Sequence, residues 1–340
     1  MADSLRGRAL TGRHEIVTVI GASGFLGRYV VQTLAQAGYR IRAVQRHPNR
    51  ALFLRPLGWV GQIELVRGYV ADEAALRRAI LHSDAVVNLV GILYEEGSQR
   101  FETVQAEGAE RIARIAAEAG IGAFVQVSAI GARRGSASAY AATKARGEAA
   151  VRAAVPSARI LRPSILFGPE DDFFNRFADM ARYSPVLPLI GGGRTRFQPA
   201  YVADVARAVL GALTLPSTAG RIFELGGQRI YTFRELMELI LRVTHRKRLL
   251  LPLPFPLATI IAALAQMSPT RLLGMPPLLT TDQVELLKAD NVVGASGEAV
   301  GTFADLGVPE PSFPEAVVAS YLWRFRKDGQ FGDQPFQDAV

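Results

Sequence analysis

The sequence predicts an α/β fold in which a doubly wound parallel sheet carries a smaller C-terminal lobe. Three observations lead to this class. Short apolar runs alternate with helix-periodic segments through the first 130 residues, as in consecutive βα units. A glycine-rich turn joins the first apolar run to the first helical segment. Beyond Pro163 the alternation loosens and proline and glycine become frequent, which indicates a second, less regular region.

Each element follows from its residue period. The first apolar run, Ile16–Ile20, suits a buried parallel strand, and the segment after it places Leu26, Val30 and Leu34 on one helical stripe that ends before Gly38. Similar apolar runs predict strands at Arg40–Val44, Ile63–Val66, Ala85–Val90, Phe124–Val127 and Arg159–Leu161. The segments between the runs predict helices at Phe25–Ala37, Asp72–Leu81, 103–119 and Ala139–Ala154.

The C-terminal half keeps part of this pattern. It predicts helices at Val202–Leu213 and Phe233–Thr244, a strand at Arg221–Leu225 and a closing helix at Val317–Phe325. We therefore expect a core over residues 14–165, a smaller lobe over residues 166–326 that is interleaved with the core, and an extended tail over residues 327–340.

Composition narrows the function classes. With 340 residues, 49% hydrophobic and 21% charged, the chain has the profile of a folded protein. The lack of cysteine excludes disulfides and thiolate chemistry, and the four histidines are too scattered to predict a metal site. The net charge of +8 would suit nucleic acid, an anionic membrane surface or an acidic protein. Because this charge is spread along the chain without a nucleic-acid motif, we expect no nucleic-acid partner.

The turn after the first predicted strand spells a three-glycine motif, Gly21-Ala22-Ser23-Gly24-Phe25-Leu26-Gly27. Its place between a strand and a helix is typical of a dinucleotide-binding, Rossmann-type core. Gly21 would make the tight turn, Gly24 would let a diphosphate approach the backbone, and Gly27 would let helix and strand pack closely. The diphosphate would lie on the helix N-terminal amides. The residues between the glycines complete the predicted contacts: Ser23, Phe25 and Leu26.

The end of the second predicted strand bears on the choice of cofactor. NAD sites usually carry a carboxylate there for the ribose diol, whereas this chain reads Val44-Gln45-Arg46-His47. Arg46 could pair with a 2′-phosphate, and Arg28 in the first helical turn could assist it. The sequence therefore favours NADPH, with NADP(H) preferred over NAD(H). The other interpretation of Arg46 is a solvated arginine at a strand end.

Tyr140 and Lys144 form the candidate catalytic pair. Four residues apart on a predicted helix, they face the same side. A neighbouring ammonium lowers the pKa of a phenol and can hold the ribose, while the phenol exchanges a proton with a substrate oxygen. This constellation is typical of a dehydrogenase.

Together these signals resemble the short-chain dehydrogenase/reductase superfamily in its extended or atypical branch. The resemblance implies further cofactor contacts by Leu89, Val90 and Gly91 on the adenosine side, by Pro163 and Ser164 near the nicotinamide, and by Ser128 and Asp72. Two positions depart from the superfamily pattern. Ser128 follows the fifth strand, but the place where the catalytic hydroxyl is usually expected, about two residues later, falls at Ile130, and Gly68-Tyr69 replaces the usual Gly-Asp step. The cofactor apparatus is thus better preserved than the catalytic one.

Several stretches resemble one group within the superfamily more closely. They are Gly24–Val31, Asn88–Gly91, Phe167–Asp171, Gln198–Val205 and the run from His245 to Leu257. This pattern is similar to the NAD(P)H-binding accessory subunit of respiratory complex I, the NADH:ubiquinone oxidoreductase, over roughly residues 16–325. The proline-punctuated part is the most specific, because ordinary reductases of the superfamily do not need it.

The resemblance implies a non-catalytic subunit in which tightly held NADPH is structural. The residues implied to hold it are Gly21, Gly24, Gly27 and Arg46, with Tyr140 and Lys144 at its ribose and nicotinamide end. The implied partners are peripheral-arm and membrane-adjacent complex I subunits, whose arm the chain would stabilise or help assemble near the quinone site. The implied location is peripheral, on the cytoplasmic face of a bacterial inner membrane, or on the matrix side in a mitochondrion.

The segment Leu249–Met267 is apolar and follows the basic run His245-Arg246-Lys247-Arg248. Its prolines at 252, 254 and 256 exclude a continuous helix, and Thr259–Met267 is helical in character but too short to span a bilayer. Basic residues beside an apolar stretch suit docking to an anionic membrane surface or a membrane-embedded partner. The alternative is a buried core segment that follows a basic loop.

Two other functions remain open. A free-standing NADPH-dependent reductase or epimerase would use Tyr140 and Lys144, and the apolar Ile130 counts against it. An NADP(H)-sensing regulatory protein would share the cofactor site and bind its partner reversibly.

Overall fold

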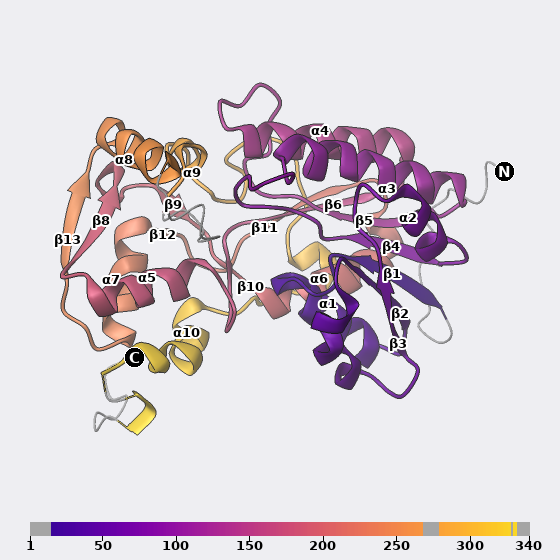
Figure 1. The fold of residues 1–340 in the computed structure, drawn as a ribbon, viewed down its shortest axis with the longest axis horizontal. Helices are drawn as coiled ribbons and strands as arrows, with labels where there is room; N and C mark the ends of the chain where they lie inside the picture. Colours follow the sequence, from indigo (N-terminus) through magenta and orange to yellow (C-terminus); the bar gives the residue numbers. More distant parts are fainter. Residues whose placement is uncertain (1–14, 268–278, 328, 332–340) are drawn as a thin grey trace.

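The computed structural model describes residues 15–267, 279–327 and 329–331. Its larger lobe is organised by a seven-stranded sheet (Figure 1). The strand order is β11-β6-β5-β4-β1-β2-β3, and every neighbouring pair is parallel. The strands are β1 (Ile16–Ile20), β2 (Arg40–Gln45), β3 (Ile63–Arg67), β4 (Ala85–Asn88), β5 (Ala123–Val127), β6 (Arg159–Pro163) and β11 (Ile222–Leu225). The winding direction reverses at β1, so a ligand crevice is expected at the carboxyl ends of β1 and β4.

Helices cover both faces of this sheet, which confirms the doubly wound α/β prediction (Figure 1). One face packs against α1 (Phe25–Gln36) and α6 (Val202–Thr214). The other packs against α2 (Glu73–Ile80), α3 (Glu107–Glu118) and α4 (Ala139–Ala154). The π-helical turn η2 (Glu102–Ala106) leads into α3. A 3-10 segment, η1 (Pro48–Leu57), was not predicted because its prolines break the helical period.

The second lobe has its own hydrophobic core. Its helices are α5 (Phe173–Tyr183), α7 (Phe233–Val243) and α10 (Pro314–Leu322), with α8 (Phe255–Met267) and α9 (Thr281–Leu286) outside them. Its strands form three pairs: β7 (Leu166–Phe167) with β10 (Ala200–Tyr201), β9 (Arg196–Phe197) with β12 (Tyr231–Thr232), and β8 (Val186–Ile190) with β13 (Leu249–Leu253). Helix α6 packs on the main sheet and β11 is a strand of it, although both follow parts of the second lobe in the sequence. The chain therefore passes between the two lobes more than once.

The proline-punctuated segment divides into two elements. Leu249–Leu253 is β13, and α8 begins only at Phe255, with Pro256 in its first turn, so the predicted exclusion of a continuous helix is confirmed. Of the predicted tail, Gly329–Phe331 forms a 3-10 turn and residues 332–340 lie outside the described residues. Over the described ranges, no helix combines the length and the apolar character needed to cross a bilayer.

Candidate dinucleotide site

The glycine turn after β1 has the geometry that a diphosphate cradle requires. Gly21 has φ +86°, in the left-handed region that favours glycine, and the Gly24 amide donates to the Gly21 carbonyl at 3.1 Å. A Cβ on Gly27 would lie 2.4 Å from the Gly21 carbonyl oxygen, so helix α1 packs on the turn only because residue 27 is glycine. Gly24 is the N-cap of α1, and within the described residues no side chain caps this helix. Its first amides can therefore receive an anion.

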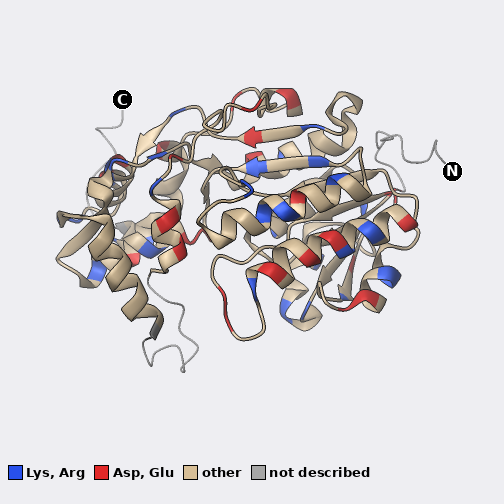
Figure 2. Cartoon of the chain, turned by 90° about the horizontal axis from the view of Figure 1, so that it is seen from above, with Lys and Arg blue, Asp and Glu red and all other residues tan. Residues whose placement is uncertain are grey.

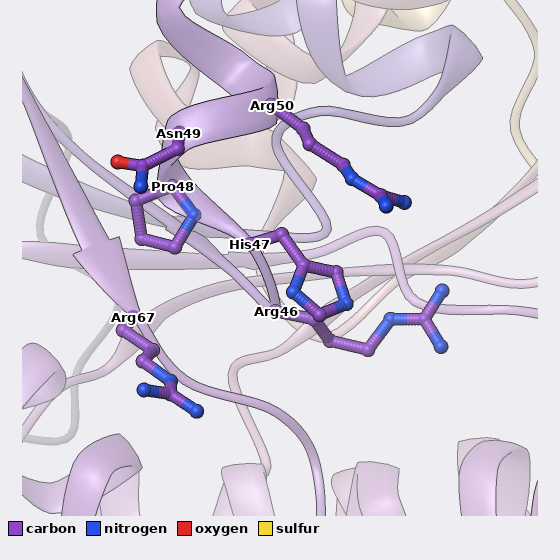
Figure 3. Close-up of a pocket in the computed structure, with 6 residues that line it drawn as sticks. All are labelled: Arg46, His47, Pro48, Asn49, Arg50 and Arg67. Carbon is purple, nitrogen blue, oxygen red and sulfur yellow. The ribbon is translucent and has the colours of Figure 1, made fainter.

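The end of β2 opens into a basic pocket of about 480 Å³ (Figure 3). Its lining residues are Arg46, His47, Pro48, Asn49, Arg50 and Arg67. None of these is acidic, so this part of the described chain offers no carboxylate for a ribose diol. Figure 3 shows the side chains of Arg46 and Arg50 extending in the same direction. The pocket therefore has the charge that a phosphate ester needs.

Arg28, the arginine expected to assist Arg46, has two partners of its own. Its guanidinium pairs with Glu170 at 2.9 Å and lies over the ring of Phe53, with 4.9 Å to the ring centroid. Glu170 belongs to the second lobe, whereas Phe53 lies in η1, directly after the pocket residues. The residues that line the basic pocket all come from the β2–β3 region.

The segment after β4 connects the two halves of the crevice. The Leu89 amide donates to the Ile20 carbonyl at 3.0 Å, and a Cβ on Gly21 would touch Val90 at 3.4 Å. Gly91 lies beside α4, since a Cβ there would come within 2.9 Å of Lys144 Nζ. Leu89, Val90 and Gly91 therefore run from the glycine turn to the predicted catalytic lysine.

Tyr140 and Lys144 lie on one face of α4, with Lys144 Nζ 5.9 Å from the centroid of the Tyr140 ring. Lys144 is buried, which lowers its pKa to about 8, and its Nζ donates to the Val127 carbonyl at 3.4 Å. Burial and the nearby Asp282 carboxylate raise the pKa of Tyr140 to about 12. The expected lowering of the phenol pKa is therefore wrong for this structure. At neutral pH the phenol keeps its proton and can donate it but cannot accept another.

The carboxyl end of β5 carries a hydroxyl at Ser128, and an apolar side chain at Ile130, where the catalytic hydroxyl was expected. Ser128 is buried, and its Oγ has no hydrogen-bond partner among the described residues, which leaves it available to a ligand. Two residues later the buried Ile130 donates its amide to the Pro163 carbonyl at 3.0 Å. The apolar side chain supplies no proton and no hydrogen bond, as the sequence indicated.

Two of the predicted cofactor residues have their polar groups occupied by the protein. Asp72 is the N-cap of α2, and its carboxylate accepts from the Ala75 amide at 2.9 Å. The Ser164 hydroxyl lies 2.6 Å from Oδ1 of Asn291. The structure therefore gives these side chains structural partners close to the predicted site.

Asp282 and Asn291 are site residues that the sequence did not indicate. The Asp282 carboxylate accepts from the Ser138 hydroxyl at 2.9 Å and the Ala139 amide at 2.7 Å, and so caps the helix that carries Tyr140. Asn291 donates from Nδ2 to the Ile130 carbonyl at 3.2 Å. Both lie more than 120 residues from their partners. The only local signal is the capping box that begins α9 at Thr280.

A buried ion cluster underlies this side of the site. Arg162 donates twice to Glu148, at 3.0 and 2.7 Å, and pairs with Glu298 at 2.7 Å. A third carboxylate, Glu224, lies 3.7 Å away and is also buried. Glu148 follows Lys144 by one turn of α4. No group of three or more potential metal ligands occurs in the described ranges of the chain.

Comparison with known proteins agrees with this geometry. The family model described as "NAD dependent epimerase/dehydratase family" matches residues 17–226. The Arabidopsis thaliana protein "NADH dehydrogenase [ubiquinone] 1 alpha subcomplex subunit 9, mitochondrial" is 35% identical over 323 residues, which cover 92% of this chain and 79% of that protein. A ceramide reductase of Caulobacter vibrioides is 35% identical over 248 residues, covering 72% of this chain and 76% of its own.

Among solved structures, an NADPH-dependent quinone oxidoreductase of Escherichia coli in complex with NADPH aligns with a TM-score of 0.69 at 20% identity. The alignment covers 90% of this chain and 99% of that one, and it supports the fold. The family and its structural neighbours bind NAD(P). This chain belongs to the NAD dependent epimerase/dehydratase family of the extended short-chain dehydrogenase/reductase superfamily, where its homologues include subunit 9 of mitochondrial complex I.

Proposed function

We propose that this chain is a non-catalytic accessory subunit of NADH:ubiquinone oxidoreductase that holds NADPH as a structural cofactor. The observation that carries the proposal is a contrast within one crevice. The glycine cradle at Gly21–Gly27 is intact, whereas the catalytic side has an apolar Ile130 and a Tyr140 phenol whose pKa is raised, so that it cannot act as a base at neutral pH. The sequence identity of 31–36% to subunits of mitochondrial complex I, over most of the chain, supports the same conclusion.

The cofactor contacts we propose lie at the carboxyl ends of the main-sheet strands and on the helices that follow them. They are Gly21, Ser23, Gly24, Phe25, Leu26, Gly27, Arg46, Leu89, Val90, Gly91, Ser128, Tyr140, Lys144, Pro163 and Ser164, with Asp72 at the N-cap of α2. When bound, NADPH would supply a reduced nicotinamide, a diphosphate and a 2′-phosphate. A ligand that binds only the folded chain stabilises it by about 4 kcal/mol at a thousandfold excess over its Kd. This stabilisation makes a structural cofactor physically reasonable.

The preference for NADPH over NADH rests on Arg46 and the acid-free basic pocket. Arg46→Ala should weaken NADPH binding by about 10- to 100-fold, because one charge-assisted hydrogen bond contributes about 1.5–3 kcal/mol. NADH binding should change by less than about twofold, since its ribose carries no phosphate. Arg134→Ala, an exposed arginine far from the pocket in sequence, is the control. Isothermal titration of both cofactors distinguishes these outcomes, and an equal loss of NADPH and NADH would refute the assignment.

The outer end of the second lobe is the proposed docking surface. Six large aliphatic side chains on β13 and α8 are 43–64% exposed: Leu249, Leu251, Leu257, Ile260, Ile261 and Leu264. Helix α8 carries no charged residue and accordingly shows neither blue nor red in Figure 2. The preceding Arg246, Lys247 and Arg248 have no carboxylate partner in the described part of the chain. Such a surface suits an anionic membrane beside membrane-adjacent complex I subunits.

The location we propose is peripheral, on the cytoplasmic face of a bacterial inner membrane or on the matrix side in a mitochondrion. Native membranes extracted with mild detergent test the assignment as a whole. The chain should migrate with an NADH-oxidising assembly and be identified there by mass spectrometry. Migration as a free protein that oxidises NADPH would contradict it.

A second candidate function is a reductase that resembles the ceramide reductase of Caulobacter vibrioides. Two observations favour it: the phenol of Tyr140 retains a proton to donate, and the hydroxyl of Ser128 has no partner within the described residues. The purified chain would then consume NADPH in the presence of a carbonyl-bearing ceramide, and Tyr140→Phe would abolish this consumption. Turnover that survives Tyr140→Phe, or no turnover, would exclude this candidate.

A further inference from the structure

A short ordered hairpin lies between β4 and the turn η2. We call residues 92–100 the strap. Glu96 and Gln99 exchange backbone hydrogen bonds at 3.1 and 2.8 Å across a two-residue turn, where Gly97 has φ +55°. The Glu95 carboxylate accepts from the Phe101 amide at 2.8 Å and so fixes the base of the strap. These three hydrogen bonds stabilise the hairpin and its base.

The strap crosses the carboxyl end of the sheet. It begins directly after Gly91 at the end of β4, yet the amide oxygen of Gln99 accepts from Arg46 Nη1 at 3.0 Å at the end of β2. In the sheet, β1 lies between β4 and β2. The Arg46–Gln99 hydrogen bond consequently bridges the position where β1 turns into the glycine motif at Gly21.

The strap also lies close to the second lobe. Burial raises the pKa of Tyr94, the carboxylates of Glu96 and of Asp172 raise it further, and the Arg176 guanidinium lowers it, so Tyr94 lies near the start of α5. The strap therefore has neighbours on both sides of the crevice, with Gln99 near the Rossmann core and Tyr94 near α5. A dinucleotide in the crevice would lie beneath it.

We propose that Gln99 is a positioning residue for NADP(H): it holds the Arg46 guanidinium over the crevice, and the strap slows release of the bound cofactor. This inference rests on the proposed function. A guanidinium has five N–H groups, and the Gln99 amide takes one of them. Because the amide is neutral, it orients Arg46 without cancelling the charge that a 2′-phosphate needs. A carboxylate at position 99 would orient Arg46 equally well but would neutralise it.

The difference between an amide and a carboxylate supplies the test. Gln99→Glu should weaken NADPH binding about tenfold or more, through pairing with Arg46 and repulsion of the 2′-phosphate, and should leave NADH binding within about twofold. Gln99→Ala should accelerate NADPH dissociation by about three- to tenfold in stopped-flow fluorescence. Ser98→Ala, at the exposed neighbouring turn position, is the matched control and should change neither quantity.

Thermal unfolding of the cofactor-free proteins separates positioning from folding. In the described part of the chain the Gln99 side chain makes one hydrogen bond, and it is exposed. Wild type, Gln99→Glu, Gln99→Ala and Ser98→Ala should therefore unfold at the same temperature within about 2 °C. Unchanged NADPH selectivity in Gln99→Glu together with an unchanged dissociation rate in Gln99→Ala would overturn the inference. That failure is distinct from failure of the proposed function, in which the wild-type chain itself would not retain NADPH.

Discussion

The two sides of the crevice contrast in how their polar groups are used. At the ends of β1 and β2, the helix amides, the basic pocket and Arg46 are available to a ligand. At the ends of β5 and β6, protein contacts occupy the Ser164 hydroxyl and the first amide of α4, although the Ser128 hydroxyl has no partner among the described residues. A fold can thus keep the geometry for binding a dinucleotide while protein contacts take up part of the opposite side, which we call the converted side.

The largest change in the free energy of unfolding should come from the buried ion cluster around Arg162, on the converted side. Arg162→Met would leave Glu148 and Glu224 buried without their cation, and loss of one partner of a buried pair costs about 3–5 kcal/mol. Chemical denaturation should show this loss in the free energy of unfolding. Glu298→Gln is the control, because its carboxylate is more than half exposed and should contribute less than about 1 kcal/mol. A loss below 1 kcal/mol in Arg162→Met would mean that the converted side does not depend on this cluster.

Two glycine variants should separate folding from binding on the cofactor side. Gly27→Ala forces a Cβ against the backbone at 2.4 Å and should cost about 1–3 kcal/mol of stability. Gly24 has φ −71°, which alanine adopts readily, and its Cβ would approach only the Gly21 carbonyl, at 3.3 Å. Gly24→Ala should therefore fold nearly as well but bind NADPH about tenfold or more weakly. Equal NADPH affinity in Gly24→Ala and wild type would place the diphosphate elsewhere.

Lys144→Met should have a smaller effect on the free energy of unfolding, and this effect should depend on pH. The pKa of Lys144 is about 8 in the folded chain, against 10.5 as the ordinary value. Between these values the unfolded chain binds more protons, so the stability of the cofactor-free protein should rise with pH. The rise from pH 8 to 9.5 should be about 1–2 kcal/mol larger in wild type than in Lys144→Met. Parallel stability curves for the two proteins would show that the lysine is not desolvated.

The smallest effect should come from Tyr140→Phe. The Tyr140 hydroxyl makes no hydrogen bond to any described residue, so its removal should change the free energy of unfolding by less than about 0.5 kcal/mol. Electron transfer from NADH to ubiquinone in the assembled complex should stay within about 20% of wild type, because no proton from this phenol is needed. Complete loss of that activity would show that the converted side still performs chemistry.

The sequence predicted the elements whose signal is local. The strands of the sheet have apolar runs, and the glycine turn has a fixed spacing between Gly21 and Gly27. It did not indicate Asp282, Asn291 or Gln99, because polar loop residues have no period and their partners are distant in the chain. The wrong pKa prediction for Tyr140 has the same origin. The spacing to Lys144 is visible in the sequence, but burial and the Asp282 carboxylate are properties of the folded chain.

The last strand of the main sheet has a consequence for how the chain can be made. Strand β11 pairs with β6, yet some sixty residues are synthesised between them, which include parts of the second lobe and helix α6 of the main sheet. A ribosome that has released only the first 165 residues therefore presents β6 with unpaired backbone groups along one edge, which is a template for aggregation. We expect that this chain cannot be shortened to its nucleotide-binding half, and that its folding waits for translation of Leu225.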